Sequence, residues 1–154
     1  MQSTFKKALK IIRDNATTDS QLGTSFEQLV KVYLENDDIQ IQQYSRVWRY
    51  KEWAKDNTNY SQDDIGIDLV AKLRGSSGYC AIQCKCYNKD HSISKSDLDS
   101  FISASSTDDF KRLVLVDTSL KGLGRNSSSI LDNINKEYIR IRSSDLDGSR
   151  IDWL

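Results

Sequence analysis

The sequence predicts an α/β fold in which a mixed β-sheet is covered by helices on both faces. Three observations lead to this prediction. Two helix-like segments come first, three strand-like segments follow with no helix expected between them, and two further strand-like segments each come after a helix-like segment. A helix between strands favours a parallel crossover, whereas short connections favour antiparallel pairs. The sheet is therefore expected to contain both kinds of pair.

The N-terminal part of the chain is predicted to form two helices, over residues 3–16 and 24–37. Their apolar residues recur at helical spacing: Phe5, Ala8, Leu9 and Ile12 in the first, and Phe26, Leu29, Val30, Tyr33 and Leu34 in the second. The segment TDSQLG (18–23) is expected to separate the two helices. Thr24 or Ser25 is a suitable N-cap for the second.

The middle of the chain is predicted to contribute three strands. Residues 39–48 alternate between polar and apolar, which indicates a strand with one polar face, and residues 49–64 are expected to form a loop. IGIDLVAKL (65–73) and YCAIQCKCY (79–87) flank the glycine-rich turn RGSSG (74–78), which is typical of a β-hairpin.

The C-terminal part is predicted to supply two helix–strand units. SKSDLDSFISASS (94–106) reads as a helix with Ser94 or Ser96 near its cap, and KRLVLVDTS (111–119) as a buried strand near the centre of the sheet. A helix over 127–137 and a strand over 138–143 complete the sheet. The last residues are expected to form no element of their own, which indicates that a longer chain continues beyond Leu154.

Composition indicates one globular domain covering residues 1–154. Lys and Arg (22) balance Asp and Glu (22), so net charge neither favours nor excludes a nucleic-acid partner. Residues 1–18 do not form a signal peptide, and no apolar run is long enough to span a bilayer. The sequence contains no GxxxxGK[ST] motif, so no ATP site of that kind is expected.

The cysteines indicate a reducing compartment. Cys80, Cys84 and Cys86 occupy alternate positions of one predicted strand, where disulfide geometry is rare. The single histidine, His91, gives little support to a zinc site. The chain is therefore expected in the cytoplasm.

Polar side chains on the predicted hairpin are the main functional signal. Ala81, Gln83 and Lys85 share one face of the second strand, while the cysteines and Ile82 share the other. The apolar face is expected to pack into the core, and the face of Gln83 to look toward a helix-poor surface or cleft. Asp68 on the first strand is expected to lie close to Gln83 and Lys85.

An acid, an amide oxygen and an ammonium at one point suit the hydrolysis of a phosphodiester. Mg²⁺ prefers oxygen ligands, and an adjacent lysine stabilises charge on phosphorus or activates water. A simple cross-strand ion pair between Asp68 and Lys85 is the alternative. Two features weigh against it: Gly66 interrupts the strand just before the acid, and Lys85 lies within an apolar segment.

These residues carry a family resemblance. DIGIDLVA followed by QCK resembles the D…QxK variant of the PD-(D/E)xK nuclease superfamily, in its Mrr-like branch. The ordered segments VWRYKEWA, ISKSDLDSFISASS, LVLVDTS and SDLDGSRIDW are similar to the N-terminal nuclease domains of single-polypeptide, Type I-like (Type ISP) ATP-dependent restriction-modification enzymes. The resemblance extends from about Gly23 to Trp153 and implies a restriction-endonuclease-like core.

The resemblance implies a role for each residue of the motif. Asp68 is the expected main metal ligand, Gln83 replaces the usual second acid, and Lys85 is the catalytic lysine. Glu27 is expected to bind the metal directly or through water, although Thr24 and Glu27 also fit a capping box. Because glutamine carries no charge, weaker metal binding is expected without DNA.

The implied function is Mg²⁺-dependent cleavage of double-stranded DNA, with Mn²⁺ as a substitute, by a bacterial cytoplasmic enzyme of phage defence. The partners implied are a C-terminal helicase-like motor, a methyltransferase and a target-recognition domain. A standalone Mrr-like nuclease or junction resolvase, and a catalytically silent DNA-binding module, stay as alternatives.

Other residues are weaker candidates. Lys89, Ser94 and Lys95 follow the QCK segment near a helix start, where backbone phosphates often bind, although each residue taken alone is more simply an ordinary surface residue. Asp64 reads more simply as a turn residue. Trp48 and Trp53 suit base stacking, but packing over the sheet is favoured.

Overall fold

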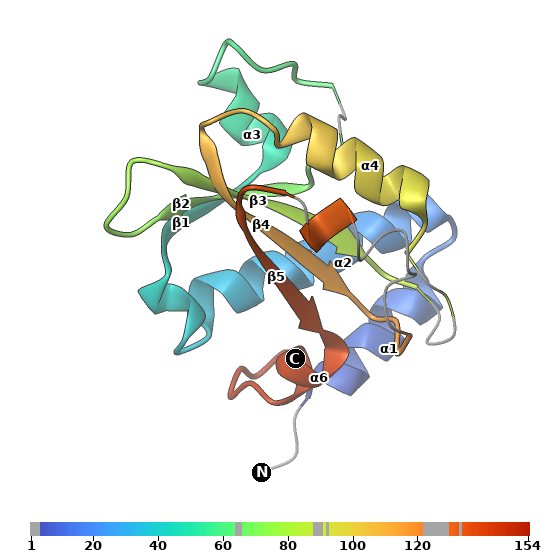
Figure 1. Cartoon of the computed structure of the whole chain (residues 1–154). Coiled ribbons are helices and arrows are strands. Elements are labelled where there is room, and N and C mark those ends of the chain that lie inside the picture. The colour runs from blue at the N-terminus through green and yellow to red at the C-terminus, as the bar shows by residue number, and fades with distance from the viewer. Residues whose placement is uncertain (1–3, 64–65, 88–90, 92, 122–129, 133) are drawn as a thin grey trace.

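The computed structural model describes residues 4–63, 66–87, 91, 93–121, 130–132 and 134–154. These residues form a five-stranded sheet in the order β1-β2-β3-β4-β5, with helices packed against both faces (Figure 1). The arrangement confirms the predicted mixed α/β fold.

The strand directions follow the predicted change from antiparallel to parallel. β1 (Tyr44–Arg49), β2 (Leu69–Leu73) and β3 (Tyr79–Lys85) form antiparallel pairs. β3 then pairs in parallel with β4 (Phe110–Asp117), and β4 with β5 (Glu137–Arg142). β4 therefore lies inside the sheet, as expected, although β3 is the middle strand.

Two predicted helices are confirmed with small changes at their ends. α1 covers Phe5–Asn15. α4 covers Lys95–Ala104, and its N-cap is Ser94, whose Oγ accepts a hydrogen bond from the amide of Asp97 at 3.1 Å.

The second helix begins earlier than predicted. α2 covers Asp19–Asn36, and Thr18 is its N-cap, with Oγ1 accepting from the amide of Gln21 at 3.1 Å. The prediction that Thr24 or Ser25 caps this helix, and the capping box with Glu27, are therefore wrong. The Thr18 cap and the acidic first turn outweigh the helix-breaking tendency of Gly23, which costs about 1 kcal/mol.

The region around the first strand also differs from the prediction. Gln40–Gln42 form a 3₁₀ turn, η1, so β1 starts five residues later than expected. The expected loop after it contains the short helix α3 (Tyr50–Lys55). Burial of Trp53, which is 2% exposed, against Tyr60, Tyr79 and Phe110 stabilises this helix.

The C-terminal region contains one element that the sequence did not indicate. α6 (Ser143–Asp147) follows β5 directly, because Asp145 accepts a hydrogen bond from the amide of Arg142 at 2.8 Å and Leu146 is buried. Of the helix predicted over 127–137, residues 130–132 are helical, and residues 127–129 and 133 lie outside the described residues. The prediction is wrong for its last residues, because 134–136 are not helical and Glu137 already belongs to β5.

The sheet has an apolar core on each face. On one face α1 and α2 pack against residues that include Val47, Leu69, Ala71, Cys80, Ile82, Cys84, Val114 and Val116. On the other face α3 and α4 cover residues that include Val70, Ala81, Phe110 and Leu113. The predicted inward face of the cysteines is confirmed. The opposite face is not helix-poor, which corrects the prediction, because α4 covers Gln83.

The cysteines Cys80, Cys84 and Cys86 are free thiols, as expected. Within the described ranges no helix has the length and apolar character needed to cross a membrane.

Candidate functional site

Asp68 lies just before β2 and alongside β3. Its amide donates a hydrogen bond to the carbonyl of Ile82 at 2.9 Å, and its Oδ2 accepts one from the amide of Cys84 at 2.7 Å. The amide of Tyr50, at the start of α3, donates to the carbonyl of Asp68 at 3.0 Å. Two neighbouring segments, β3 and the start of α3, thus fix the backbone and the carboxyl group of Asp68.

Gly66 allows the chain to reach this position. Its φ of +102° belongs to the region that favours glycine, and a Cβ there would lie 3.1 Å from the backbone of Ser100 in α4. The α4 backbone therefore approaches too closely for any larger residue to replace Gly66 without a shift.

Glu27 of α2 brings a second carboxyl group to Asp68. Burial, and then the charge and a hydrogen bond of Glu27, raise the pKa of Asp68 to about 7, against the opposing effects of the Cys84 amide and the Lys85 ammonium. Two acids held together in a partly buried place are costly unless a cation or a proton lies between them. The pair is therefore a candidate cation site.

Arg49 at the end of β1 supplies a positive charge to this pair. Its Nη2 donates to Oε2 of Glu27 at 2.8 Å, and the Glu27 side chain is 19% exposed. The arginine offsets one of the two carboxylates but leaves Asp68 without a cationic partner within hydrogen-bond distance, as far as the described residues show.

Lys85 ends β3 and lies beside Asp97 of α4. Its Nζ is 3.7 Å from Oδ1 of Asp97, so this ion pair replaces the simple Asp68–Lys85 pair that was the alternative. Tyr87 donates to Oδ2 of the same carboxylate at 2.9 Å. Although burial acts in the opposite direction, Tyr87 and Lys85 together lower the pKa of Asp97.

Gln83 lies in β3 between the two residues that Asp68 contacts. Its side chain is 3% exposed, and its Nε2 donates to the carbonyl of Asp97 at 3.3 Å. Its Oε1 is buried without a hydrogen-bond partner in the described part of the chain. Such an acceptor costs about 1–3 kcal/mol, so its persistence favours an external partner such as a cation.

Asp68 and Glu27 line a cleft of about 410 Å³. Its lining residues are Glu27, Arg49, Tyr50, Lys51, Glu52, Lys55, Gln62, Ile67 and Asp68. Gln83 and Lys85 do not line this cleft and lie on the α4 side of the site. The cleft is thus formed by α2, the end of β1, α3 and the segment before β2.

The site residues fit an oxygen-preferring divalent cation. The described residues contain no group of three His, Cys, Asp or Glu side chains that could hold a metal ion. They do provide two neighbouring carboxyl groups and one unpartnered amide oxygen. This donor set suits Mg²⁺ or Mn²⁺, which keep several waters when they bind to proteins.

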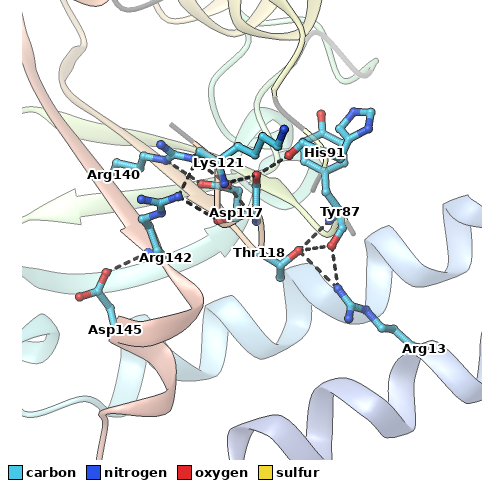
Figure 2. A network of polar contacts seen from close by, with 10 residues as sticks. Arg13, Tyr87, His91, Asp117, Thr118, Lys121, Arg140, Arg142 and Asp145 are labelled. Atoms are coloured by element: carbon cyan, nitrogen blue, oxygen red, sulfur yellow. Dashed lines mark hydrogen bonds and ion pairs between the residues drawn. The ribbon is translucent and has the colours of Figure 1, made fainter. Parts of the chain in front are cut away.

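The backbone directly after Lys85 is fixed by polar contacts (Figure 2). Thr118, in the loop after β4, donates its amide hydrogen to the carbonyl of Lys85 at 3.2 Å, and its Oγ1 accepts from the amide of Tyr87 at 2.7 Å. Arg13 of α1 donates to the carbonyl of Tyr87 at 2.7 Å. These contacts limit where Lys85 and Tyr87 can move.

The residues predicted to contact DNA are described only in part, and their contact with DNA is not tested. Lys95 forms an ion pair with Asp99 at 2.9 Å on its own helix, and Ser94 caps that helix. Lys89 and Asp64 lie outside the described residues. DNA contact by Lys89, Ser94 and Lys95 therefore stays a prediction.

Two site features were not identified from the sequence. Asp97 contacts both Gln83 and Lys85, and its only signal was the Ser94-x-x-Asp97 spacing after the QCK segment. The Arg49 contact with Glu27 joins residues far apart in the chain. Trp53 is core, which agrees with the favoured reading, and Trp48 is half-buried against Tyr79.

The fold is similar to parts of several solved structures. A structure described as "ATP-dependent Type ISP restriction-modification enzyme LlaBIII bound to DNA" aligns with a TM-score of 0.75 and 28% identity, over 99% of this chain and 9% of that one. "DNA modification-dependent restriction endonuclease AspBHI" aligns with a TM-score of 0.57 and 18% identity, over 94% of this chain and 34% of that one. "MspJI Restriction Endonuclease in Complex with 27-mer Oligonucleotide" aligns with a TM-score of 0.51 and 15% identity, over 94% and 29%.

The last two likenesses concern the fold alone, and this chain spans about a tenth of the length of the LlaBIII chain. Fold and site together define a domain of the restriction-endonuclease class. The model of the Mrr_cat_2 family, described as "Restriction endonuclease", matches residues 35–154, and the chain belongs to that family. A comparison with curated protein sequences gave no match.

Proposed function

We propose that this chain is the Mg²⁺-dependent DNA endonuclease domain of a larger ATP-dependent restriction-modification enzyme. One observation carries the proposal: Asp68 shares its site with the carboxyl group of Glu27 and lies within electrostatic reach of Lys85. Family membership supports the nuclease activity, and the likeness to the Type ISP enzyme supports the larger context. The motor, methyltransferase and target-recognition domains belong to the proposal only.

Asp68, Glu27 and an oxygen of Gln83 are the residues that would hold the cation. When bound, such a cation neutralises charge on a phosphate oxygen and lowers the pKa of a bound water. The amide of Cys84 orients the Asp68 carboxylate. Arg49 compensates the charge of Glu27 while no cation is bound.

Lys85 would act on the substrate. Its side chain is 29% exposed, and Asp97 holds it through one carboxylate oxygen. An ammonium in this position stabilises the negative charge that develops on the phosphate, or orients the attacking water. Because Asp97 also binds Gln83, one residue of α4 positions both members of the QCK segment.

The test is nicking of supercoiled plasmid in Mg²⁺ or Mn²⁺ by the wild type, Asp68→Ala and Lys85→Ala. Each substitution is expected to reduce the rate at least about 100-fold, the lower range for loss of an acid–base or charge-stabilising group. Lys10→Ala, which removes an exposed lysine on α1, is the matched control and should nick like the wild type.

Equal nicking by all four proteins would overturn the proposal. A wild type that binds DNA but never cuts it, even when joined to a motor domain, would instead support a silent DNA-binding module.

A further inference from the structure

α3 forms a wall of the cleft that contains the two acids. Its inner residues, Tyr50, Trp53 and Ala54, are buried in the aromatic core. Its outer residues Lys51 and Lys55 are exposed and line the cleft together with Asp68. Burial of the aromatic side fixes the direction in which the two lysines face.

Lys51 and Lys55 have no acidic partner among the described residues, unlike several other helical lysines. Lysines on α1, α2 and α4 form ion pairs with an acid four residues later: Lys10 with Asp14, Lys31 with Glu35, and Lys95 with Asp99. For Lys51 and Lys55 the described residues provide no ion pair or hydrogen bond of the side chain. Glu52 on the same wall leaves a net positive charge on α3.

The arginines at the other end of the sheet do not offer a comparable surface. Arg140 is bound to Asp117, and Arg142 donates to the carbonyls of Ser119 and Lys121 (Figure 2). Their guanidinium groups are already engaged within the chain. In the part of the chain that the structure describes, the lysines of α3 have no such partner, and they line the cleft together with Asp68.

We propose that Lys51 and Lys55 bind backbone phosphates of the DNA strand that enters the cleft beside Asp68. This inference rests on the proposed function, since it assumes that DNA is the substrate. Lysines contact phosphates as point charges and do not read bases. The α3 wall would therefore hold DNA of any sequence, and recognition of a target would depend on other domains.

The test is the affinity of this chain for a fluorescein-labelled duplex of arbitrary sequence. Ca²⁺ replaces Mg²⁺ so that the duplex stays intact, and the salt concentration is varied. Each lost phosphate contact reduces the slope of log K against log salt by about 0.9. The Lys51→Gln/Lys55→Gln variant is expected to lose about two units of slope and roughly tenfold or more in affinity at low salt.

Two further variants make the test specific. Lys6→Gln/Lys10→Gln removes two lysines at the same helical spacing from α1, where their side chains are 83% and 75% exposed, and should bind DNA like the wild type. Lys51→Arg/Lys55→Arg keeps both charges and should show the wild-type slope. This result would show that the glutamine variant loses DNA affinity through its charges and not through a folding defect.

The outcomes separate the two proposals. If the wild type cuts plasmid DNA and the Lys51→Gln/Lys55→Gln variant keeps the wild-type slope and affinity, the α3 inference is wrong and the nuclease proposal stands. If the wild type neither binds nor cuts DNA under any of these conditions, the proposed function is wrong as well.

Discussion

Asp68 lies just before β2 and Asp117 ends β4, the two strands that flank β3, and the surroundings of the two acids are opposite in kind. The side chain of Asp117 is 0% exposed, and Arg140 binds both of its oxygens, at 3.0 and 2.9 Å (Figure 2). The amide of Ser119 adds a third hydrogen bond at 3.2 Å. By contrast, Asp68 accepts one hydrogen bond from the amide of Cys84, and its other neighbour is the carboxyl group of Glu27.

The difference separates a structural acid from a functional one. Asp117 is satisfied by the chain itself, so its pair with Arg140 joins β4 to β5 without any ligand. Asp68 has a pKa raised to about 7 because the chain buries it beside Glu27. A site that is unfavourable when empty and ionised is one that a divalent cation can stabilise.

Breaking the structural pair is expected to have the largest effect on stability. Arg140→Met leaves the carboxylate of Asp117 buried without its partner, so unfolding in urea should show a loss of about 3–5 kcal/mol. Arg142→Met is the control and should cost less, because the Arg142 guanidinium donates to the carbonyls of Ser119 and Lys121 and to no carboxylate among the described residues. An Arg140→Met chain as stable as the wild type would show that the pair contributes nothing.

Ionisation of Asp68 is expected to change the free energy of unfolding with pH, by somewhat less than the Arg140→Met substitution does. The folded chain keeps a proton on Asp68 up to a pKa of about 7, whereas the unfolded chain loses it near pH 4. Stability without metal therefore falls as the pH rises from about 4 to 7, by roughly 2–4 kcal/mol at about 1.4 kcal/mol per pKa unit.

Urea unfolding of the wild type and of Asp68→Asn in EDTA, at several pH values, checks this prediction. The asparagine variant has no carboxyl group to ionise at this position. The free energy of unfolding of the variant, relative to that of the wild type, should therefore increase as the pH rises across that range. Parallel pH profiles for the two proteins would contradict the proposed burial of Asp68 beside Glu27.

Much of the hairpin could be predicted because strand periodicity acts locally. The alternation around Gln83 and Lys85 indicated their shared face, and Asp97 of α4 contacts both. The cover over that face could not be predicted, since it depends on how α4 packs across β3. The helix α3 is too short for a periodic signal and is stabilised by burial of Trp53 in a distant aromatic cluster.

The start of α2 could not be predicted from the local sequence either. Gly23 and its polar neighbours favour a break, but Thr18 provides a cap and the helix continues through them. The correct start places Glu27 well inside the helix, where its side chain is available to Arg49 and Asp68 instead of the helix end. The sequence pattern identified Glu27 as a candidate, but it could not decide whether Glu27 caps the helix or belongs to the site.

The most direct test of the central claim is anomalous diffraction at the manganese edge from crystals of this chain grown with Mn²⁺ and a short DNA duplex. We expect a Mn²⁺ ion bound to the carboxylate of Asp68 at about 2.0–2.3 Å, together with an oxygen of Glu27 or Gln83. Manganese found only at places away from Asp68, with DNA present in the cleft, would contradict it.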